Sequence, residues 1–144
     1  MKEIDNNMKL SDYLKAIPSL MVMGTIVYFS SLSNPLPSRP EGVPVELDVN
    51  ILLHIGEFAF LAFSISFGFI DKVKAKYLIS FAIFFAISDE IHQYFVPNRF
   101  FDIYDVIVDV SGVILGFLVY IFLVKLKNKF VKSETLNGDK NELA

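Results

Sequence analysis

The stretch SDEIHQYFVPNRFFDIYDVIVD, residues 88–109, decides how this 144-residue chain is organised. It joins two apolar runs, 77–87 and 106–124, and it holds a dense group of polar side chains. These are five acids, a histidine, a glutamine and an arginine: Asp89, Glu90, His92, Gln93, Arg99, Asp102, Asp105 and Asp109. Because ionisable groups are costly to keep within apolar segments, we predict that this stretch carries the functional site.

The composition is more apolar than that of an ordinary soluble domain. Hydrophobic residues make up 53% of the chain and charged residues 20%, with a mean hydropathy of +0.50, whereas soluble domains carry about 25% charged residues. The chain has no cysteine, which excludes disulfides, thiolate nucleophiles and zinc–thiolate sites. The net charge of −3 is small, and we expect no nucleic-acid partner.

Four apolar runs predict an all-α fold, a bundle of four transmembrane helices. A helix needs about 17–25 apolar residues to cross a bilayer, and the four runs have about that length. They cover residues 16–32, 51–70, 77–95 and 105–124. We expect one membrane domain over residues 1–132 and a disordered polar tail over 133–144. Pro18 is expected in the first turn of the first helix, where a missing N–H is tolerated.

The segment around the first run allows one alternative. Residues 33–50 contain four prolines, which exclude a continuous helix and predict a loop. The first run also fits a secretory signal peptide, because lysines precede it and small residues follow it. Removing it would leave three apolar runs and no evident soluble domain.

The distribution of basic residues predicts the orientation. All but two of the 13 lysines and arginines lie before the first run, between the second and third, or after the fourth. Only Arg39 and Arg99 lie in the other two loops. Since basic residues favour the cytoplasmic side, we expect cytoplasmic termini, an outward-facing site, and a multi-pass protein of the cell membrane.

Helical spacing places polar residues from two runs at the same depth. His54 and Glu57 are three residues apart near the start of the second run. Asp89 and Glu90 precede Gln93 by four and three residues at the end of the third run. Because residues three or four apart share a helix face, both groups are predicted to meet at the outer end of the bundle.

The fourth run adds a stripe of acids and small residues at the same end. Asp105, Asp109, Gly112 and Gly116 fall on one helix face, and the G-x-x-x-G spacing lets a second helix approach closely. We predict that this face packs inside the bundle. The alternative is a homo-oligomer formed through Gly112 and Gly116.

The charge at this end is unbalanced, which suggests a ligand. Glu57 and the five acids of residues 88–109 stand against Arg99 and two histidines. Their repulsion is relieved if some acids are protonated, if a divalent cation binds, or if a cationic ligand docks. The candidate metal ligands are Glu57, Glu90, Asp105 and Asp109.

Less functional interpretations of the same acids stay open. Asp89 and Asp102 would be simply solvated, and Asp105 and Asp109 would favour the dipole at the start of the fourth helix. A polar network that only holds helices together is a further alternative. For Arg99, the choice is between an internal pair with an acid, Glu90 or Asp105, and bidentate binding of a carboxylate or phosphate.

Residues 88–116 resemble the signature of the VanZ-like family of small membrane proteins. The shared elements are an acidic-x-x-Q motif, a proline turn with arginine, and an aspartate before a small-residue helix. HIGEF, residues 54–58, resembles the family's H-x-x-E element, and YFSSL, residues 28–32, resembles the end of its first helix. The resemblance spans about residues 28–116.

The resemblance implies site positions and a cellular role. The family's polar and small positions fall on His54, Glu57, Glu90, Gln93, Arg99, Asp102, Asp105, Gly112 and Gly116. Asn50 and Ile51 depart from its Asp-Lys pair, Asn98 from its turn glycine and Asp109 from its asparagine. The resemblance implies an envelope role related to resistance to the glycopeptide teicoplanin, and it implies no reaction.

Three functions compete, and the first is favoured because known hydrolase motifs are absent. In the first, an outward polar pocket binds an envelope lipid, a wall precursor or a glycopeptide-like ligand without catalysis. Its expected lining is His54, Glu57, Glu90, Gln93, Arg99, Asp102, Asp105 and Asp109. The second is a metal-assisted hydrolase or transferase for a lipid-linked phosphate, with His54 or Glu90 as general base. An ion-coupled transporter ranks last, because no polar residue continues inward past Asp109.

Overall fold

The described part of the chain consists of four helices. The computed structural model describes residues 10–33 and 49–142, and side chains within 14–33 and 49–132. Over these ranges there is no strand, so the all-α prediction is confirmed. The helices are α1 (Leu10–Ser30), α2 (Val49–Phe69), α3 (Ala75–Tyr94) and α4 (Ile103–Glu142).

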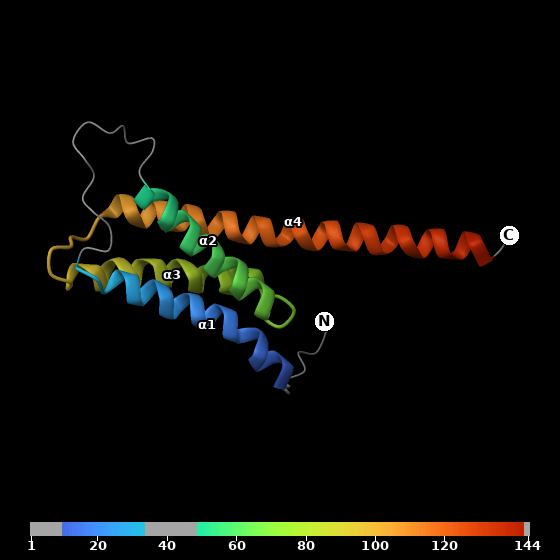
Figure 1. The fold of residues 1–144 in the computed structure, drawn as a ribbon, viewed down its shortest axis with the longest axis horizontal. Helices are drawn as coiled ribbons and strands as arrows, with labels where there is room; N and C mark the ends of the chain where they lie inside the picture. Colours follow the sequence, from blue (N-terminus) through green and yellow to red (C-terminus); the bar gives the residue numbers. More distant parts are fainter. Residues whose placement is uncertain (1–9, 34–48, 143–144) are drawn as a thin grey trace.

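The helices run alongside one another, and the segments that carry the candidate site residues lie at one end of the bundle. Figure 1 shows α1 ending, α2 beginning and the α3–α4 connection turning at the same end. The short turn between α2 and α3 lies at the opposite end, and α4 continues well beyond it. Residues 88–109 therefore lie far from the start of α1 and from the end of α4.

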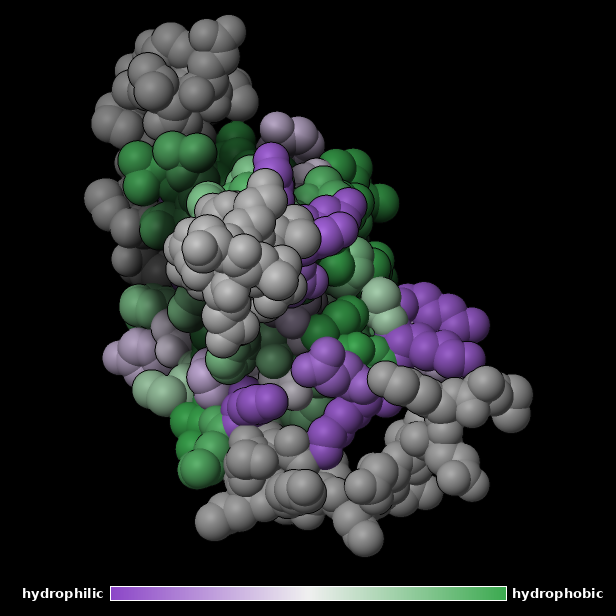
Figure 2. Space-filling model, turned by 90° about the vertical axis from the view of Figure 1, so that its right-hand side faces the viewer, coloured by the Kyte–Doolittle hydropathy of each residue, from purple (hydrophilic) through white to green (hydrophobic). Residues whose placement is uncertain are grey.

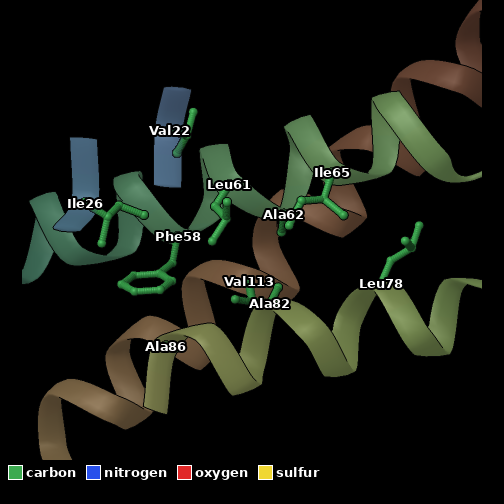
Figure 3. Packing of buried hydrophobic residues seen from close by; sticks show 10 residues of the cluster. All are labelled: Val22, Ile26, Phe58, Leu61, Ala62, Ile65, Leu78, Ala82, Ala86 and Val113. Atoms are coloured by element: carbon green, nitrogen blue, oxygen red, sulfur yellow. The ribbon is translucent and has the colours of Figure 1, made fainter. Parts of the chain in front are cut away.

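A small apolar core joins all four helices. Phe58 and Leu61 of α2, Ala82 of α3 and Val113 of α4 are almost fully buried, and Ile26 of α1 packs against them (Figure 3). This burial stabilises the arrangement of the helices because each helix contributes side chains that have no contact with the surroundings.

The two glycines of α4 allow α2 and α4 to pack closely. A Cβ atom added to Gly112 would lie 2.6 Å from the carbonyl oxygen of Ile55, and one on Gly116 would collide with the carbonyl of Ala59. Both obstacles are backbone atoms of α2, so a side chain at either glycine would push the two helices apart. The glycine stripe therefore packs inside one chain.

The outer surface of the helices is strongly apolar. Large side chains exposed by more than half include Leu20, Phe60, Phe84 and Leu118, one from each helix. Figure 2, which looks onto the end opposite the site, shows hydrophilic residues sharing the surface with hydrophobic ones. Soluble monomers seldom expose continuous apolar patches of more than a few hundred Å².

Two helices are long and apolar enough to cross a membrane. They are Val49–Phe69 and the segment Ile103–Lys132 of α4. The apolar part of α1, Leu14–Ser30, is shorter, and the last turns of α3 carry acids and other polar residues that lower its hydropathy. Two of the four helices therefore have the length and hydropathy of a membrane span.

Two details of the helices differ from expectation or extend beyond it. Pro18 lies inside α1 and not in its first turn, because the helix begins at Leu10 in the polar segment before the apolar run. Proline inside a helix is better tolerated in membrane proteins than in soluble ones. The helix of α4 continues to Glu142, through most of the expected tail; disorder of residues 133–144 stays a prediction. The expected proline loop, 33–50, lies largely outside the described residues.

Candidate functional site

Three ionisable residues from three helices form one group, which we call the Asp109 cluster: His54 of α2, Glu90 of α3 and Asp109 of α4. The Nδ1 atom of His54 lies 2.9 Å from Oδ1 of Asp109. One ligand atom from each of the three residues lies within 4.8 Å of those of the other two. Glu90 and Asp109 have no exposed surface, and His54 is about one-fifth exposed.

The helix packing explains why these residues meet. Gly112, three residues after Asp109, lies against the backbone of Ile55, which directly follows His54. The close contact of α2 and α4 therefore brings the imidazole within hydrogen-bonding distance of the carboxylate. α3 ends at the same depth and supplies Glu90 from its last turns.

Two carboxylate oxygens in the Asp109 cluster have no hydrogen-bond partner among the described residues. They are Oε1 of Glu90 and Oδ2 of Asp109. The other oxygen of Glu90, Oε2, accepts a long hydrogen bond of 3.4 Å from the backbone N–H of Asp102. Over residues 14–33 and 49–132, neither carboxylate forms a salt bridge with lysine or arginine. Leaving a charged group buried and unpaired is costly, and His54 is the one side chain of this cluster that can carry a positive charge.

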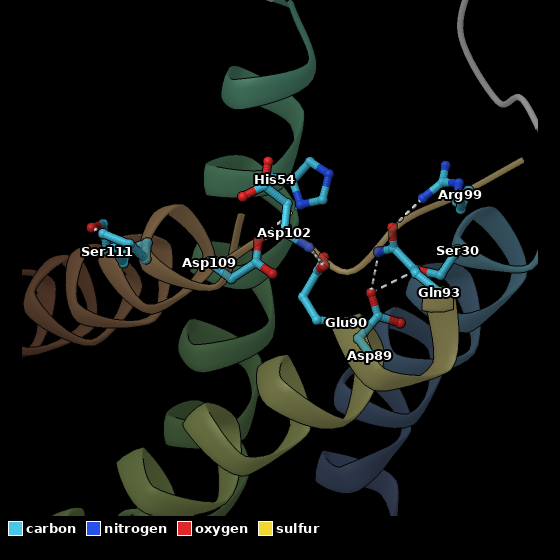
Figure 4. A network of polar contacts seen from close by, with 10 residues as sticks. Ser30, His54, Asp89, Glu90, Gln93, Arg99, Asp102, Asp109 and Ser111 are labelled. Carbon is cyan, nitrogen blue, oxygen red and sulfur yellow. Dashed lines mark hydrogen bonds and ion pairs between the residues drawn. The ribbon is translucent and has the colours of Figure 1, made fainter. Parts of the chain in front are cut away.

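A second polar group, which we call the Asp89 cluster, lies beside the first: Ser30, Asp89, Gln93 and Arg99. Figure 4 shows its members linked in a chain. Ser30 Oγ and Gln93 Nε2 donate to Oδ2 of Asp89 at 2.7 and 3.0 Å. Arg99 donates through Nη1 to Oε1 of Gln93. Asp89 and Gln93 are buried, and Arg99 is half-buried, so the chain leads from the interior to a guanidinium near the surface.

The turn after α3 holds Arg99 in place. Asn98 has a φ of 65°, a left-handed conformation that glycine and asparagine adopt most readily. The Arg99 N–H donates to the carbonyl of Val96 at 3.2 Å, and the Val96 side chain is buried. Asparagine therefore fills the position where the resemblance expects a turn glycine and meets the same backbone requirement.

The structure separates the remaining candidate residues. Glu57 is half-buried one helical turn after His54 and has no hydrogen bond to a described residue. Asp102 is exposed, and its Oδ1 accepts the Tyr104 N–H at 2.8 Å, which is how an N-cap residue stabilises the start of a helix. Asp105 lies half-buried in the first turn of α4, where an acid favours the helix dipole.

Three of the alternative interpretations are wrong in this structure. Asp89 is not solvated, because Ser30 of α1 covers it and donates to it. Asp109 is not a first-turn acid, because it lies deeper in α4 and pairs with His54. Arg99 is not paired with Glu90; it donates a hydrogen bond to Gln93.

Sequence reasoning missed two serines at the end of α1, Ser30 in its last position and Ser31 directly after it. Ser30 was not expected in the site, although YFSSL marked the end of the first run, and a serine gives no distinctive signal there. Ser31 Oγ also lies 3.0 Å from Nε2 of the exposed His92. Of the four predicted metal ligands, Glu90 and Asp109 belong to the Asp109 cluster; Glu57 and Asp105 lie outside that group of three.

Comparison with known families finds one match. The family model described as VanZ/LLP1 matches residues 4–125, which includes all four helices as far as the start of the lysine-rich part of α4. This confirms the resemblance expected from the sequence. Comparisons with curated proteins and with solved structures find no match.

Proposed function

The chain belongs to the VanZ/LLP1 family, and from this premise we propose that it is an integral membrane protein of the cell envelope. Through Arg99 of the Asp89 cluster, it binds the anionic head group of an envelope lipid or of a lipid-linked wall precursor. The observation that carries the proposal is the Asp89 cluster, in which a buried chain of hydrogen bonds holds a half-buried arginine at one end of an apolar bundle.

An inverted distribution of polarity supports four membrane spans. The charged and polar residues Asp89, Glu90, Gln93 and Asp109 are buried, while every helix exposes large apolar side chains. In water this arrangement would be unfavourable; in lipid it satisfies both sets of residues. Residues 1–132 then form one membrane domain, with α1 and α3 spanning the membrane beside α2 and α4.

The basic residues support the orientation. Lys72, Lys74 and Lys76 lie at the α2–α3 turn, and further lysines follow in α4, all away from the clusters. With the positive-inside preference, the termini are cytoplasmic and the clusters face outward in a multi-pass protein of the cell membrane.

The packing of α1 favours its retention over removal as a signal peptide. Val22 and Ile26 belong to the buried core, and Ser30 donates to the buried Asp89. Without α1, the core side chains of α2 and the carboxylate of Asp89 would lose their cover. An intact first helix is therefore part of the proposed site.

The head-group contact is assigned to Arg99. Gln93 accepts only one of its guanidinium hydrogens, and an arginine has five donors in a fork that matches phosphate oxygens. The half-buried position limits competition from water. A head group docked there would lie beside the Asp109 cluster, since Glu90 and Asp89 are neighbours on α3.

Native mass spectrometry of the detergent-solubilised protein tests this proposal. The probe is a long-chain polyprenyl phosphate, and the matching polyprenol without phosphate is the control ligand. We expect R99A to weaken binding of the phosphate about 10-fold or more, as loss of a charge-assisted hydrogen bond of about 1.5–3 kcal/mol implies, and K129A, at an exposed lysine of α4, to leave it unchanged. Equal binding of phosphate and polyprenol, or equal loss in both variants, would remove the basis for the proposal.

The same variants test a role in antibiotic resistance. Cells that express the wild-type chain are expected to tolerate more teicoplanin than cells without it, and R99A is expected to abolish the difference. The control is K129A, which should protect as the wild type does. Identical susceptibility of all four strains would argue against this role while leaving lipid binding open to the direct measurement.

The Asp109 cluster favours a second candidate function, metal-assisted hydrolysis or transfer at a lipid-linked phosphate. His54 and two carboxylates lie together within 4.8 Å, and a divalent cation polarises a phosphoryl oxygen. Asp109 and one of the other two residues would hold the cation, and the remaining residue, His54 or Glu90, would take a proton from the attacking group. Release of inorganic phosphate from the polyprenyl phosphate, lost in D109N, would support catalysis; binding without turnover at any divalent cation would favour the first function.

A further inference from the structure

We propose that His54, Glu90 and Asp109 form a binding site for a single divalent transition-metal cation of the zinc or manganese class. This inference deepens the proposed function and rests on it only for the nearby phosphate, because the cation can be measured without any lipid. The ligand set differs from the four-acid set suggested by the sequence: it contains an imidazole, and it leaves out Glu57 and Asp105.

The geometry is close to that of a metal site. The three ligand atoms lie within 4.8 Å of one another, and the His54 and Asp109 atoms are 2.9 Å apart. In a tetrahedral zinc site with bonds of about 2.0–2.2 Å, ligand atoms lie about 3.4 Å apart. Small side-chain adjustments would therefore close the group around an ion, which would replace the hydrogen bond between His54 and Asp109.

The unpartnered oxygens are an independent observation that points to a ligand. Oε1 of Glu90 and Oδ2 of Asp109 belong to side chains with no exposed surface, and neither oxygen has a hydrogen-bond partner among the described residues. Figure 4 shows both carboxylates between α3 and α4, beside the His54 ring. Buried polar atoms without partners are uncommon in native proteins, and a cation would satisfy both.

A doubly charged ion would balance the charge of this cluster. Glu90 and Asp109 bring two carboxyl groups, and no lysine or arginine within the described ranges forms a salt bridge with either. A divalent cation would neutralise both carboxylates and leave His54 as a neutral ligand. The cost of burying these charges would then be offset by metal–ligand bonds.

The chemistry of the three ligands selects the kind of cation. Calcium and magnesium prefer all-oxygen sites, whereas an imidazole with two carboxylates suits zinc and neighbouring transition metals. Three protein ligands leave one position open for water or for an oxygen of a ligand, as in catalytic zinc sites.

A bound cation would change which residue could act as general base. A His54 nitrogen or a Glu90 oxygen that holds the ion cannot at the same time accept a proton. With the ion bound, neither residue is the base, and Glu57, half-buried one turn from His54, is the nearest carboxylate on the same helix face.

Metal analysis of the full chain tests the inference. Protein purified in detergent is stripped with a chelator, dialysed against zinc chloride at a series of free concentrations, and its metal content measured by mass spectrometry. We expect saturation at one zinc ion per chain, with magnesium unable to compete at equal concentration. H54Q, E90Q and D109N should each weaken zinc binding by about 10-fold or more, since even outer-sphere changes cost about 10–100-fold.

Two controls keep the result interpretable. D71N removes an exposed acid from the opposite end, and K129A removes an exposed lysine of α4; both should bind zinc as the wild type does. Zinc should also raise the unfolding temperature of the wild type and of D71N but not of E90Q. A stripped wild-type chain that takes up no zinc, or E90Q and D109N with wild-type affinity, would overturn the inference.

The lipid measurement distinguishes the two proposals. Zinc binding without Arg99-dependent binding of polyprenyl phosphate would uphold the cation site and contradict the proposed function. Lipid binding that depends on Arg99 in a chain that takes up no zinc would do the reverse.

Discussion

The Asp89 and Asp109 clusters lie side by side on α3 and differ in how their carboxylates are satisfied. Oδ2 of Asp89 accepts two hydrogen bonds from neutral donors, Ser30 and Gln93. Glu90, the next residue, accepts one long backbone hydrogen bond and has a second oxygen without a described partner. Asp89 also has one oxygen, Oδ1, without a partner among the described residues. The two acids therefore differ in the other oxygen, which accepts two short hydrogen bonds in Asp89 and one long hydrogen bond in Glu90.

Because of this difference, we assign the two clusters different roles, one in positioning a side chain and the other in binding a ligand. The Asp89 cluster is linked from α1 through α3 to Arg99, so its hydrogen bonds fix the orientation of a side chain near the surface. The Asp109 cluster joins α2, α3 and α4, and its partners are too few for its charge. We interpret the first as support for the arginine and the second as the place that a ligand completes.

The largest effect is expected from a change at the contact between α2 and α4, on which the Asp109 cluster depends. G112L would force a side chain against the backbone of Ile55, and we expect a loss of about 3 kcal/mol or more of unfolding free energy, at the upper end for overpacking. Zinc binding should be lost because His54 moves away from Asp109. The measurement is unfolding in detergent together with zinc content; G24L, at a helical glycine with no neighbour within 4 Å, is the control. Unchanged zinc binding in G112L would show that the cluster does not depend on this contact.

The next effect concerns the Asp89 cluster alone. D89A removes the acceptor of Ser30 and Gln93, and leaving such buried donors without partners costs about 2 kcal/mol. S30A should cost about 1 kcal/mol by the same reasoning. S66A is its matched control, because the buried Ser66 donates only to Ala62 of its own helix, and such bonds add little. Chemical unfolding curves would measure all three, and equal values for S30A and S66A would contradict the linking role of Ser30.

A smaller effect is expected at Asp102, which directly precedes α4. D102A removes the side-chain acceptor of the Tyr104 N–H and should cost about 1 kcal/mol as a lost N-cap. The Asp102 backbone N–H that donates to Glu90 is unaffected, so zinc binding should persist. D102N, which keeps a capping oxygen, should restore stability. Loss of zinc binding in D102A would mean that the Asp102 side chain belongs to the metal site.

The smallest effect is the stability difference between E90Q and the wild type, and its sign depends on whether zinc is present. In chelator, E90Q should be within about 0.5 kcal/mol of the wild type or slightly more stable, because it removes a buried unpaired charge and keeps an acceptor for Asp102. In zinc the order should reverse, since only the wild type gains the binding energy. Thermal unfolding under both conditions measures this, with D71N expected to follow the wild type throughout. A destabilised E90Q in chelator would mean that Glu90 already has its partners.

The four helices were accessible from the sequence, because apolar runs are local signals. The packing of the glycine stripe inside the bundle was predicted from the small-residue spacing and from the acids on the same face, whereas its partner, α2, came only from the structure. Pro18 was misplaced because the start of α1 lies in a polar segment, where hydropathy does not mark a helix. The continuation of α4 through the lysine-rich segment was missed for the same reason.

The site was predicted in its location and less well in its contacts. Spacing along one helix placed Asp89 and Gln93 on one face, and the structure has the bond between them. Spacing cannot show which helices face each other, so the pair His54–Asp109 and the donor Ser30 came only from the packing. For Arg99, the sequence allowed an internal pair with an acid or the binding of a carboxylate or phosphate, and it gave no sign of the hydrogen bond to Gln93 that the structure has.

The positions of the two clusters along the chain set an order for their assembly. Every residue of the Asp89 cluster precedes residue 100, so its hydrogen bonds need only α1, α3 and the following turn. The Asp109 cluster needs Gly112 and Asp109, which leave the ribosome later. During synthesis the Asp89 cluster can thus form first. His54 and Glu90 become buried only when the last helix, α4, packs against α2 and α3.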